Sequence, residues 1–491
     1  MSFLGVDIGS SRVKAVAFSE EGRELGSASR GYPVSSPAPG FAELDGEEVM
    51  RAAFDVIGAA ASAARSGGDP VRALAISSQG EAFLPVDGSG TILAPAMISS
   101  DTRATGLMAE FAAGFGAGRL YRITGHTPSG MFTLAKLLWL AKFRPEIRRR
   151  AKRFLCFEDL LVSRLGAEPA MGWPLAGRTM LFDVETHRWS EELCDAAGFS
   201  PAEFARVLPS GTAAGTVSPR VAAALGLEPG TLIVSGGHDQ ALAALGCGAC
   251  SPGCAMYAAG SVECIAPVHS RLIRSDELFR GNLCCYDFAL PGRYLSVAYS
   301  LTGSNFMQYF LEEFCRDLGG DYAALAGSMP PEPSTLNVLP YFTASGTPYF
   351  DTRTPGTVYG WRLTTTRGEL FKAVQEGIAM EMRRNLELLT ASGFQVEVLV
   401  ASGGGCRLPA LVQLRADVLN LPFRVIASGE AGCRGAALLA RSAHCGVPVE
   451  KLPGFLPAVT AELHPEPGRA ARYQEKFEQW KTFTDTVRRE L

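Results

Sequence analysis

The stretch Gly236-Gly237-His238-Asp239-Gln240 decides the fold expected for this chain. An apolar run at 231–235 precedes it and predicts a buried strand, and a run of small residues at 241–247 follows it and predicts a helix. Open α/β sheets place their chemistry where strands end and helices begin. Asp239 is therefore a candidate base that takes a proton from a sugar hydroxyl, behind two glycines that leave room for a ligand. The alternative is that Asp239 only caps the helix.

The composition is that of a globular chain with two or more domains. The 491 residues are 47% hydrophobic and 20% charged, which allows large cores to form. The net charge is −4, and no basic block predicts nucleic-acid binding. The long uncharged run at 241–262 contains Pro252 and several glycines, so it predicts helix, turn and strand rather than a membrane span. The first residues enter a strand without a basic leader, so we expect no signal peptide and a cytoplasmic location.

The 12 cysteines are most simply interpreted as reduced thiols that serve as small apolar residues. Cys247, Cys250 and Cys254 lie close together in the sequence, which raises the alternative of a metal site. Their spacing straddles the end of the predicted helix, and no second CxxC or paired histidine follows. We therefore favour the thiol interpretation.

Residues 3–18 predict a β-hairpin whose turn could hold a phosphate. Apolar runs at 3–8 and 13–18 flank the turn Gly9-Ser10-Ser11-Arg12. Backbone N–H groups and the hydroxyls of Ser10 and Ser11 can wrap a phosphate. Asp7 could hold Mg²⁺ through water, and Lys14 could reach phosphate oxygens. The alternative is an ordinary hairpin with a polar turn.

The second half of the chain repeats this pattern. Residues 256–266 again predict strand, turn and strand around Gly260-Ser261, without the acidic residue. Two copies predict a duplicated domain with a cleft between the halves. Gly403-Gly404-Gly405 lies between a predicted strand at 396–400 and a predicted helix at 408–419, where a nucleotide could approach the backbone. Tight packing of that helix on its sheet is the alternative.

Two polar loops in the first half carry groups that hydrogen-bond sugar hydroxyls. The predicted strand at 71–77 ends in Ser78-Gln79-Gly80-Glu81, and a second loop carries Asp101 and Arg103. For any one of these side chains, a solvated loop charge is the alternative. At the far end, residues 470–491 predict an amphipathic helix. Its apolar stripe consists of Tyr473, Phe477, Trp480, Phe483 and Val487. We expect that stripe to pack onto the body of the protein, and a partner surface is the alternative.

In this order and spacing, the motifs make the chain resemble the FGGY carbohydrate kinases of the actin-like ATPase superfamily over nearly its whole length. The resemblance is carried by Asp7-Ile8-Gly9-Ser10, Pro39-Gly40-Phe41-Ala42-Glu43, Asp101-Thr102-Arg103, residues 131–140, residues 178–183, Gly237-His238-Asp239-Gln240, Gly260-Ser261, Glu376-Gly377-Ile378-Ala379, Gly403-Gly404-Gly405 and Ala416-Asp417. It implies an α/β fold with two ribonuclease-H-like domains flanking a deep cleft. We place these domains at 1–245, mainly for the sugar, and 246–491, mainly for ATP.

The resemblance also implies roles for individual residues. Asp239 would be the catalytic base, and Asp7 would hold the Mg²⁺ of Mg-ATP. The phosphates would face Ser10, Ser11, Lys14, Gly260 and Ser261, and the adenosine would face Gly303, Gly403, Gly404 and Gly405. The sugar would contact Gln79, Glu81, Asp101, Arg103 and Asp239. Because the base accepts its proton late in phosphoryl transfer, we expect Asp239 to need no large pKa shift.

The implied activity is ATP-dependent phosphorylation of a hydroxyl on a ketopentose, a ketohexose or a sugar alcohol. Two alternatives stay open: an actin-like nucleotide-binding regulator without sugar kinase activity, and a kinase of a non-sugar hydroxylated signal molecule. We expect a small-molecule sugar or polyol as partner, with neither nucleic acid nor membrane, and leave a homodimer open.

Several positions depart from the family pattern and affect the substrate. Ser99 stands where many relatives have Trp, which removes a stacking wall and widens the pocket. Gly80-Glu81-Ala82 follows Gln79 where xylulose kinases typically have Met-His-Gly. These changes favour a ketose or sugar alcohol of five or six carbons over glycerol and do not favour xylulose. For Glu263, just after the second turn, the only role we can suggest is sugar contact.

Overall fold

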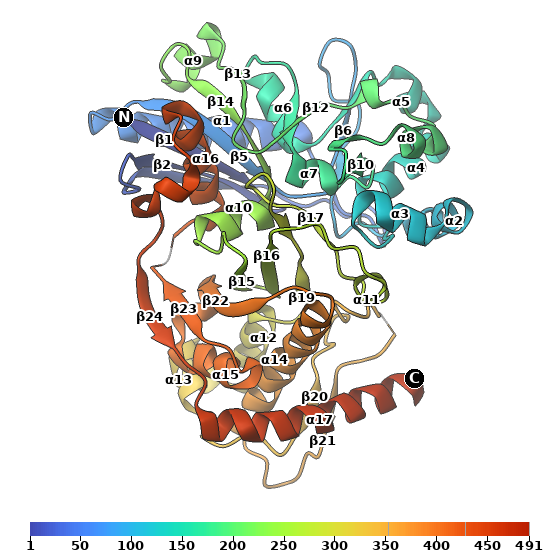
Figure 1. The fold of residues 1–491 in the computed structure, drawn as a ribbon, viewed down its shortest axis with the longest axis vertical. Coiled ribbons are helices and arrows are strands. Elements are labelled where there is room, and N and C mark those ends of the chain that lie inside the picture. Colours follow the sequence, from blue (N-terminus) through green and yellow to red (C-terminus); the bar gives the residue numbers. More distant parts are fainter. Residues whose placement is uncertain (352, 428, 491) are drawn as a thin grey trace.

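The computed structural model describes residues 1–351, 353–427 and 429–490, and it has two lobes (Figure 1). Each lobe is built on one large sheet, of six and eight strands respectively. The first sheet has the order β13-β14-β5-β1-β2-β3. Its strands are β1 (Ser2–Ile8), β2 (Arg12–Ser19), β3 (Glu24–Gly31), β5 (Val71–Ser78), β13 (Ala213–Thr216) and β14 (Leu232–His238).

The second sheet has the order β17-β18-β16-β15-β22-β23-β24, with β19 beside β16. Its strands are β15 (Gly253–Ala259), β16 (Glu263–His269), β17 (Tyr286–Asp287), β18 (Tyr294–Leu295), β19 (Ala298–Ser300), β22 (Val396–Ser402), β23 (Phe423–Ile426) and β24 (Val459–Leu463). In each sheet a hairpin lies beside a parallel strand: β1–β2 beside β5, and β15–β16 beside β22. The predicted strand–turn–strand repeat is confirmed.

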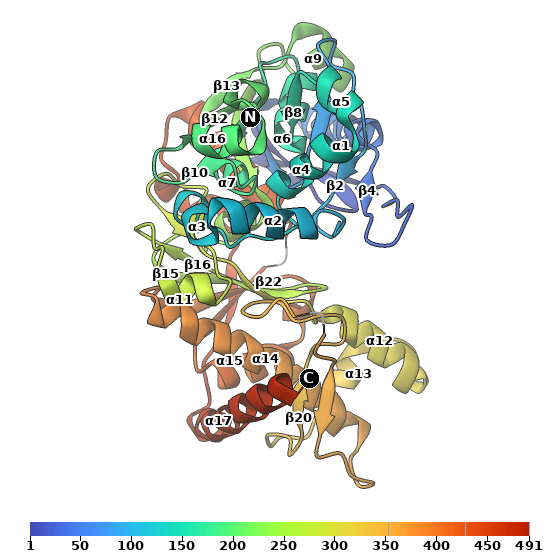
Figure 2. The same ribbon diagram turned by 90° about the vertical axis from the view of Figure 1, so that its right-hand side faces the viewer.

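Helices cover both sheets, and the two views show which lobe each belongs to (Figures 1 and 2). The helices of the first lobe used below are α1 (Gly46–Ser66), α4 (Thr133–Phe143), α6 (Phe157–Arg164), α7 (Trp173–Gly177) and α10 (Asp239–Gly246). Those of the second lobe are α12 (Ser304–Phe314), α14 (Arg367–Ala391), α15 (Pro409–Leu419) and α17 (Pro467–Glu490). Within the described ranges, no helix combines the length and the apolar character needed to cross a bilayer.

Helix α16 (Ala431–Cys445) comes from the second half of the chain but packs on the first sheet, against β1, β5 and α10 (Figure 1). Glycines allow this close approach. A Cβ at Gly5 would overlap the carbonyl of Cys433, and a Cβ at Gly435 would overlap the carbonyl of Leu242. The core of the first lobe therefore includes a helix encoded almost 200 positions after its last strand, between residues 238 and 431.

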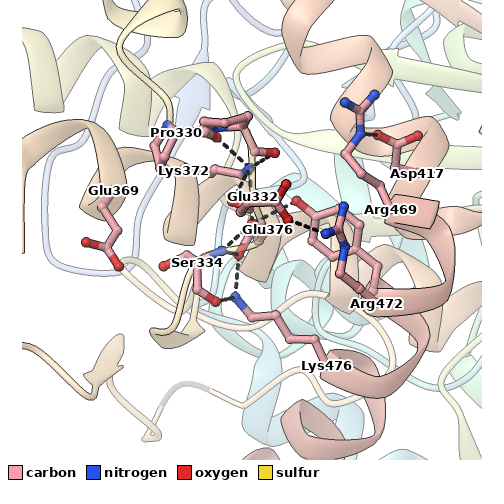
Figure 3. A network of polar contacts seen from close by, with 12 residues as sticks. Pro330, Glu332, Ser334, Glu369, Lys372, Glu376, Asp417, Arg469, Arg472 and Lys476 are labelled. Atoms are coloured by element: carbon pink, nitrogen blue, oxygen red, sulfur yellow. Dashed lines mark hydrogen bonds and ion pairs between the residues drawn. The ribbon is translucent and has the colours of Figure 1, made fainter. Parts of the chain in front are cut away.

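A buried ion cluster fixes helix α17 to the second lobe (Figure 3). Glu376 of α14 pairs with Lys476 of α17, accepts a hydrogen bond from the Tyr473 hydroxyl at 2.8 Å and accepts another from the Ser334 N–H at 3.0 Å. Lys372 closes the cluster, because its Nζ donates to the carbonyl of Pro330 at 2.8 Å.

The apolar stripe of α17 packs onto the body of the protein. Tyr473, Phe477 and Trp480 are buried, whereas Phe483 and Val487 are partly buried against the same core. The predicted packing of this stripe is confirmed. Of the predicted helix at 470–491, position 491 lies outside the described residues.

Candidate active site

Asp239 lies where β14 ends and α10 begins, as the sequence predicts. The N-cap of α10 is His238, so the alternative that Asp239 caps the helix is wrong. A bulge in β14 between Val234 and Gly237 turns the chain toward the site. Buried Glu158 of α6 braces that bulge, since its Oε1 accepts the Gly236 N–H at 2.8 Å. Gly237 needs its freedom there because its φ is +151°.

The carboxylate of Asp239 is partly enclosed, with 32% of the side chain exposed. Burial raises its pKa to about 7, and the nearby carboxylates of Asp7 and Glu81 add to the effect. This differs from the expectation of no large shift. The main reason is burial of the Asp239 carboxyl in the folded chain, and the nearby carboxylates of Asp7 and Glu81 come second, so a single motif does not reveal the shift.

Glu81 is held rigidly at this site. Arg178, at the end of α7, donates from Nε to Glu81 Oε1 at 2.6 Å. Two residues of α4 bind the Glu81 backbone carbonyl: Thr133 Oγ1 at 3.0 Å and Lys136 Nζ at 3.1 Å. Burial lowers the pKa of Lys136 to about 8. Gly80 leaves room for His238, because a Cβ at Gly80 would lie 3.0 Å from the His238 ring.

Gln79 links the end of β5 to the turn Gly9-Ser10-Ser11-Arg12, hereafter the first turn. Its Nε2 donates to the Gly9 carbonyl at 3.0 Å, and the Tyr32 hydroxyl donates to the same oxygen at 2.6 Å. Its Oε1 is buried without a hydrogen-bond partner among the described residues.

Asp101 and Arg103 form a compact unit with the predicted motif at 39–43. Arg103 Nη2 lies 2.6 Å from Asp101 Oδ2 and 2.7 Å from Glu43 Oε1. The guanidinium stacks 3.5 Å from the ring centroid of Phe41. Asp101 Oδ2 also accepts the N–H of Ala42 at 2.8 Å. Both charges are thus paired within the protein, and the predicted contact of Asp101 and Arg103 with a sugar stays a prediction.

The first turn is bordered by Asp7 and Lys14. Asp7 Oδ1 accepts a hydrogen bond from Ser77 Oγ at 2.6 Å, and burial raises the pKa of this carboxyl. Lys14 Nζ pairs with Glu430 Oε2 at 2.6 Å. Ser10 and Ser11 lie exposed at the tip of the turn. The Lys14 ammonium therefore has a carboxylate partner next to the start of α16.

The turn at Gly260-Ser261, hereafter the second turn, lies beside other glycines that are predicted to face the nucleotide. The Ser304 N–H donates to the Gly260 carbonyl at 2.9 Å, and a Cβ at Gly303 would lie 2.9 Å from the Ser261 carbonyl oxygen. A Cβ at Gly403 would lie 2.6 Å from the carbonyl oxygen of Ala259, so Gly403 is required by packing. Gly405 likewise packs on Ala259, whereas Gly404 faces open space.

A cleft of about 980 Å³ opens beside Lys14 and Gly403-Gly404; of the described residues, Asp239 and the Ser10-Ser11 and Gly260-Ser261 turns are not in its lining. Lys14 and residues 27–29 of β3 line it from the first lobe, and Gly403, Gly404 and Arg407 line it from the second. Lys14 and two of the three glycines at 403–405 thus face one cleft, and their contact with a nucleotide stays a prediction.

Two family models match the chain. Residues 2–246 match the N-terminal domain of the FGGY family of carbohydrate kinases, and residues 256–444 match the C-terminal domain. The chain belongs to this family. The xylulose kinase of Lactococcus lactis subsp. lactis is 25% identical over 485 residues, which cover 97% of this chain and 95% of that protein. A gluconokinase of Bacillus licheniformis is 25% identical over 450 residues, with 89% and 86% covered.

The solved structures agree. A kinase from Brucella ovis, described as a xyloylose kinase, superposes with a TM-score of 0.92 at 25% identity and covers 100% of both chains. This FGGY kinase therefore has the two-domain actin-like ATPase fold, and it is a carbohydrate kinase.

Glu263 does not contact the site, so the suggested sugar contact is wrong. In this FGGY kinase Glu263 is buried in the second lobe, where Arg415 Nε lies 3.0 Å from its Oε2. The Tyr257 hydroxyl donates to the same carboxylate. The nearby cysteines also give no metal centre: among the described residues no three His, Cys, Asp or Glu side chains are arranged to hold an ion.

Sequence reasoning missed three residues of the kinase site: Arg178, His238 and Tyr286. His238 Nε2 lies 3.2 Å from Asp239 Oδ1, and its Nδ1 lies 2.8 Å from the Tyr286 hydroxyl. Arg178 lies in the quoted motif at 178–183, and His238 lies in the central stretch. Tyr286 lies in no motif, so no local signal marks it.

Proposed function

We propose that this FGGY kinase transfers the γ-phosphoryl group of ATP to a hydroxyl of a neutral ketopentose, ketohexose or sugar alcohol, with Asp239 as the general base. The observation that carries the proposal is the position of Asp239. It lies where β14 meets α10, near Asp7 at the end of β1 and Glu81 in the loop after β5. A substrate hydroxyl bound between Glu81 and Asp239 would therefore face the phosphate-binding turns.

The protein would contribute to this reaction mainly by positioning the reactants and by stabilising the charge on the phosphoryl group. Phosphoryl transfer passes through a loose transition state, so alignment and electrostatic stabilisation dominate. Asp239 would orient the hydroxyl and accept its proton, and a base with a pKa of about 7 is well matched to that task near neutral pH. Backbone N–H groups of the Ser10-Ser11 and Gly260-Ser261 turns would stabilise the phosphoryl oxygens.

The residues fit Mg-ATP. Mg²⁺ is usually held by one or two carboxylates, water and phosphate oxygens rather than by a protein cage. Asp7 supplies such a carboxylate, with one oxygen bonded to Ser77. A bound Mg²⁺ would neutralise charge on the phosphates. Gly404 faces open space at the cleft, which would admit the adenosine beside the backbone.

The charges around the base favour a neutral substrate over a sugar acid. Asp7, Glu81 and Asp239 are acidic, and the nearby cations are already engaged: Arg178 binds the Glu81 carboxylate, and Lys136 binds the Glu81 carbonyl. A substrate carboxylate would face like charges without a free cation among these residues, which is costly in a partly buried site. We therefore place the substrate among uncharged polyhydroxy compounds.

The experiment is a coupled assay of ADP release with Mg-ATP over pentuloses, hexuloses, polyols, glycerol and gluconate, with Asp239→Asn alongside. We expect one neutral compound to give turnover that the variant loses by about 10²–10⁴-fold. ATP binding, measured by calorimetry, should persist in the variant. ATP binding without turnover on any sugar would overturn the proposal and favour the regulator or the non-sugar kinase.

A further inference from the structure

We propose that His238 and Tyr286 are positioning residues for the base: the Tyr286 hydroxyl holds His238, and the His238 imidazole holds the Asp239 carboxylate. This inference rests on the proposed function of Asp239. It assigns a task to two buried side chains that the reaction otherwise leaves unused.

The contacts form a chain of three residues. The Tyr286 hydroxyl lies 2.8 Å from His238 Nδ1, and His238 Nε2 lies 3.2 Å from Asp239 Oδ1. His238 is 5% exposed and Tyr286 is fully buried, so the contact between these two side chains is shielded from water. Gly80 leaves room for the ring in this position, because a Cβ there would press on His238 Cδ2 and Nε2.

The protonation states fix the direction of the chain. Burial, together with the Arg178 guanidinium, keeps the pKa of His238 well below its usual value, so the imidazole is neutral and carries one N–H. Burial raises the pKa of Tyr286 well above its usual value, so its hydroxyl keeps its proton. A lone pair on Nε2 facing the carboxylate would be repulsive. The hydrogen is therefore on Nε2, and the Tyr286 hydroxyl donates to Nδ1.

The consequence concerns the two oxygens of Asp239, of which Oδ1 lies 3.2 Å from His238 Nε2. The imidazole N–H lies beside Oδ1 and leaves Oδ2 to accept the substrate proton. Fixing a reacting carboxylate in one orientation contributes to rate because small misplacements are costly. Neither His238 nor Tyr286 needs to exchange a proton in the reaction.

Tyr286 comes from the second half of the chain. It lies on β17, which pairs with β18 in the second sheet. The segment nevertheless docks on the first lobe: Asp287 pairs with His187 at 2.9 Å, and the Cys285 N–H donates to the Gly125 carbonyl at 2.9 Å. Figure 1 shows β17 at the junction between the lobes. The orientation of the base thus depends on a strand of the second sheet.

The test compares Tyr286→Phe, His238→Ala and His238→Gln with wild type on the substrate found in the panel. Tyr286→Phe removes one hydroxyl and keeps the ring that packs 5.0 Å from His126. We expect kcat to fall by about tenfold or more in Tyr286→Phe and further in His238→Ala. KM for the sugar and ATP affinity should change little. His238→Gln, which keeps an N–H donor, should recover part of the rate.

Tyr121→Phe is the matched control, because the Tyr121 hydroxyl is buried and donates to the Leu283 carbonyl at 3.4 Å, outside the site. Its kcat should equal that of wild type. Wild-type kcat in Tyr286→Phe and His238→Ala, with Asp239→Asn inactive, would overturn the inference and leave the proposed function intact. An active Asp239→Asn would instead overturn the proposed function.

A second readout does not depend on turnover. The chain has six histidines, so ¹⁵N NMR can assign the His238 imidazole by its loss in His238→Gln. We expect a neutral ring protonated on Nε2 at a pH well above 7, where Asp239 is ionised, and a shift of its resonances in Tyr286→Phe. A ring protonated on Nδ1, or one unaffected by Tyr286→Phe, would contradict the inference.

Discussion

Arg178 and Glu81 form a buried pair across 97 positions of sequence, with Arg178 Nε donating to Glu81 Oε1 at 2.6 Å. The pair joins the end of α7 to the loop after β5. Glu81 adopts a left-handed backbone conformation with φ of +67°, which a non-glycine residue seldom takes without support. The ion pair, together with Thr133 and Lys136, supplies that support.

Removing the arginine should therefore destabilise the first lobe. Arg178→Met leaves the Glu81 carboxylate buried and unpaired, at a cost of about 3–5 kcal/mol in the free energy of unfolding. Urea titration measures this cost. The matched control is Arg280→Met, which breaks an exposed pair with Asp276 and should change stability by less than about 1 kcal/mol. Equal effects of the two substitutions would contradict the structural role of Arg178.

The pH dependence follows from the raised pKa of Asp239. The base must be ionised to accept a proton, so kcat/KM should rise with pH through about 7 and level off above it. Asp239→Asn should lose this limb together with most of the activity. The assay is the pH profile of coupled ADP release, and Asp276→Asn, on the exposed surface, should keep the wild-type profile.

The same carboxylate should lower stability at higher pH. Its pKa is higher in the folded state than the ordinary value of 3.8, so the folded state binds more protons between these values and loses stability as pH rises through that window. Asp239→Asn removes this loss. We expect the variant to melt at a higher temperature than wild type at pH 8, and a lower melting temperature there would count against the assignment.

Glu263 should matter for stability and not for substrate choice. Glu263→Gln weakens the buried pair with Arg415 and should destabilise the protein, whereas the order of preference among sugars should stay the same. Denaturation and the substrate panel measure the two effects separately. A changed order of preference would show that Glu263 does reach the sugar.

The C-terminal helix should be required for a stable second lobe. Trp480 is buried, and its Nε1 donates to the Val338 carbonyl at 2.7 Å. Trp480→Ala should cost about 3–5 kcal/mol. Gln479→Ala, on the exposed face of the same helix, should change stability by less than about 0.5 kcal/mol. Similar stability of the two variants would mean that α17 is only loosely attached.

Local patterns in the sequence predict the elements that carry the site. The strand before Asp239, the two hairpins and the strand before Gly403 follow from apolar runs that end in glycine-rich turns. The stripe on α17 follows from helical periodicity. Each of these signals is contained within about 20 residues, the range over which periodicity and turn chemistry act.

Contacts between residues far apart in the sequence explain which features of the site could not be predicted. Glu263 looks like a site residue because it follows the Gly260-Ser261 turn, but its partner Arg415 lies 152 positions away. Tyr286 reaches His238 from a different sheet. The raised pKa of Asp239 arises mainly from burial and also from the carboxylates of Asp7 and Glu81, which approach it only in the folded chain. No local pattern contains these pairs, since tertiary packing alone creates them.

The placement of helix α16 has a consequence for synthesis. Strands β1, β5 and β14 leave the ribosome long before residues 431–445, which pack over β1 and β5. Until that helix arrives, the apolar face around Gly5 has no cover in the nascent chain. The first lobe can therefore reach its native packing only after nearly the whole polypeptide has been made. A fragment that ends near residue 245 should be prone to aggregation and dependent on chaperones.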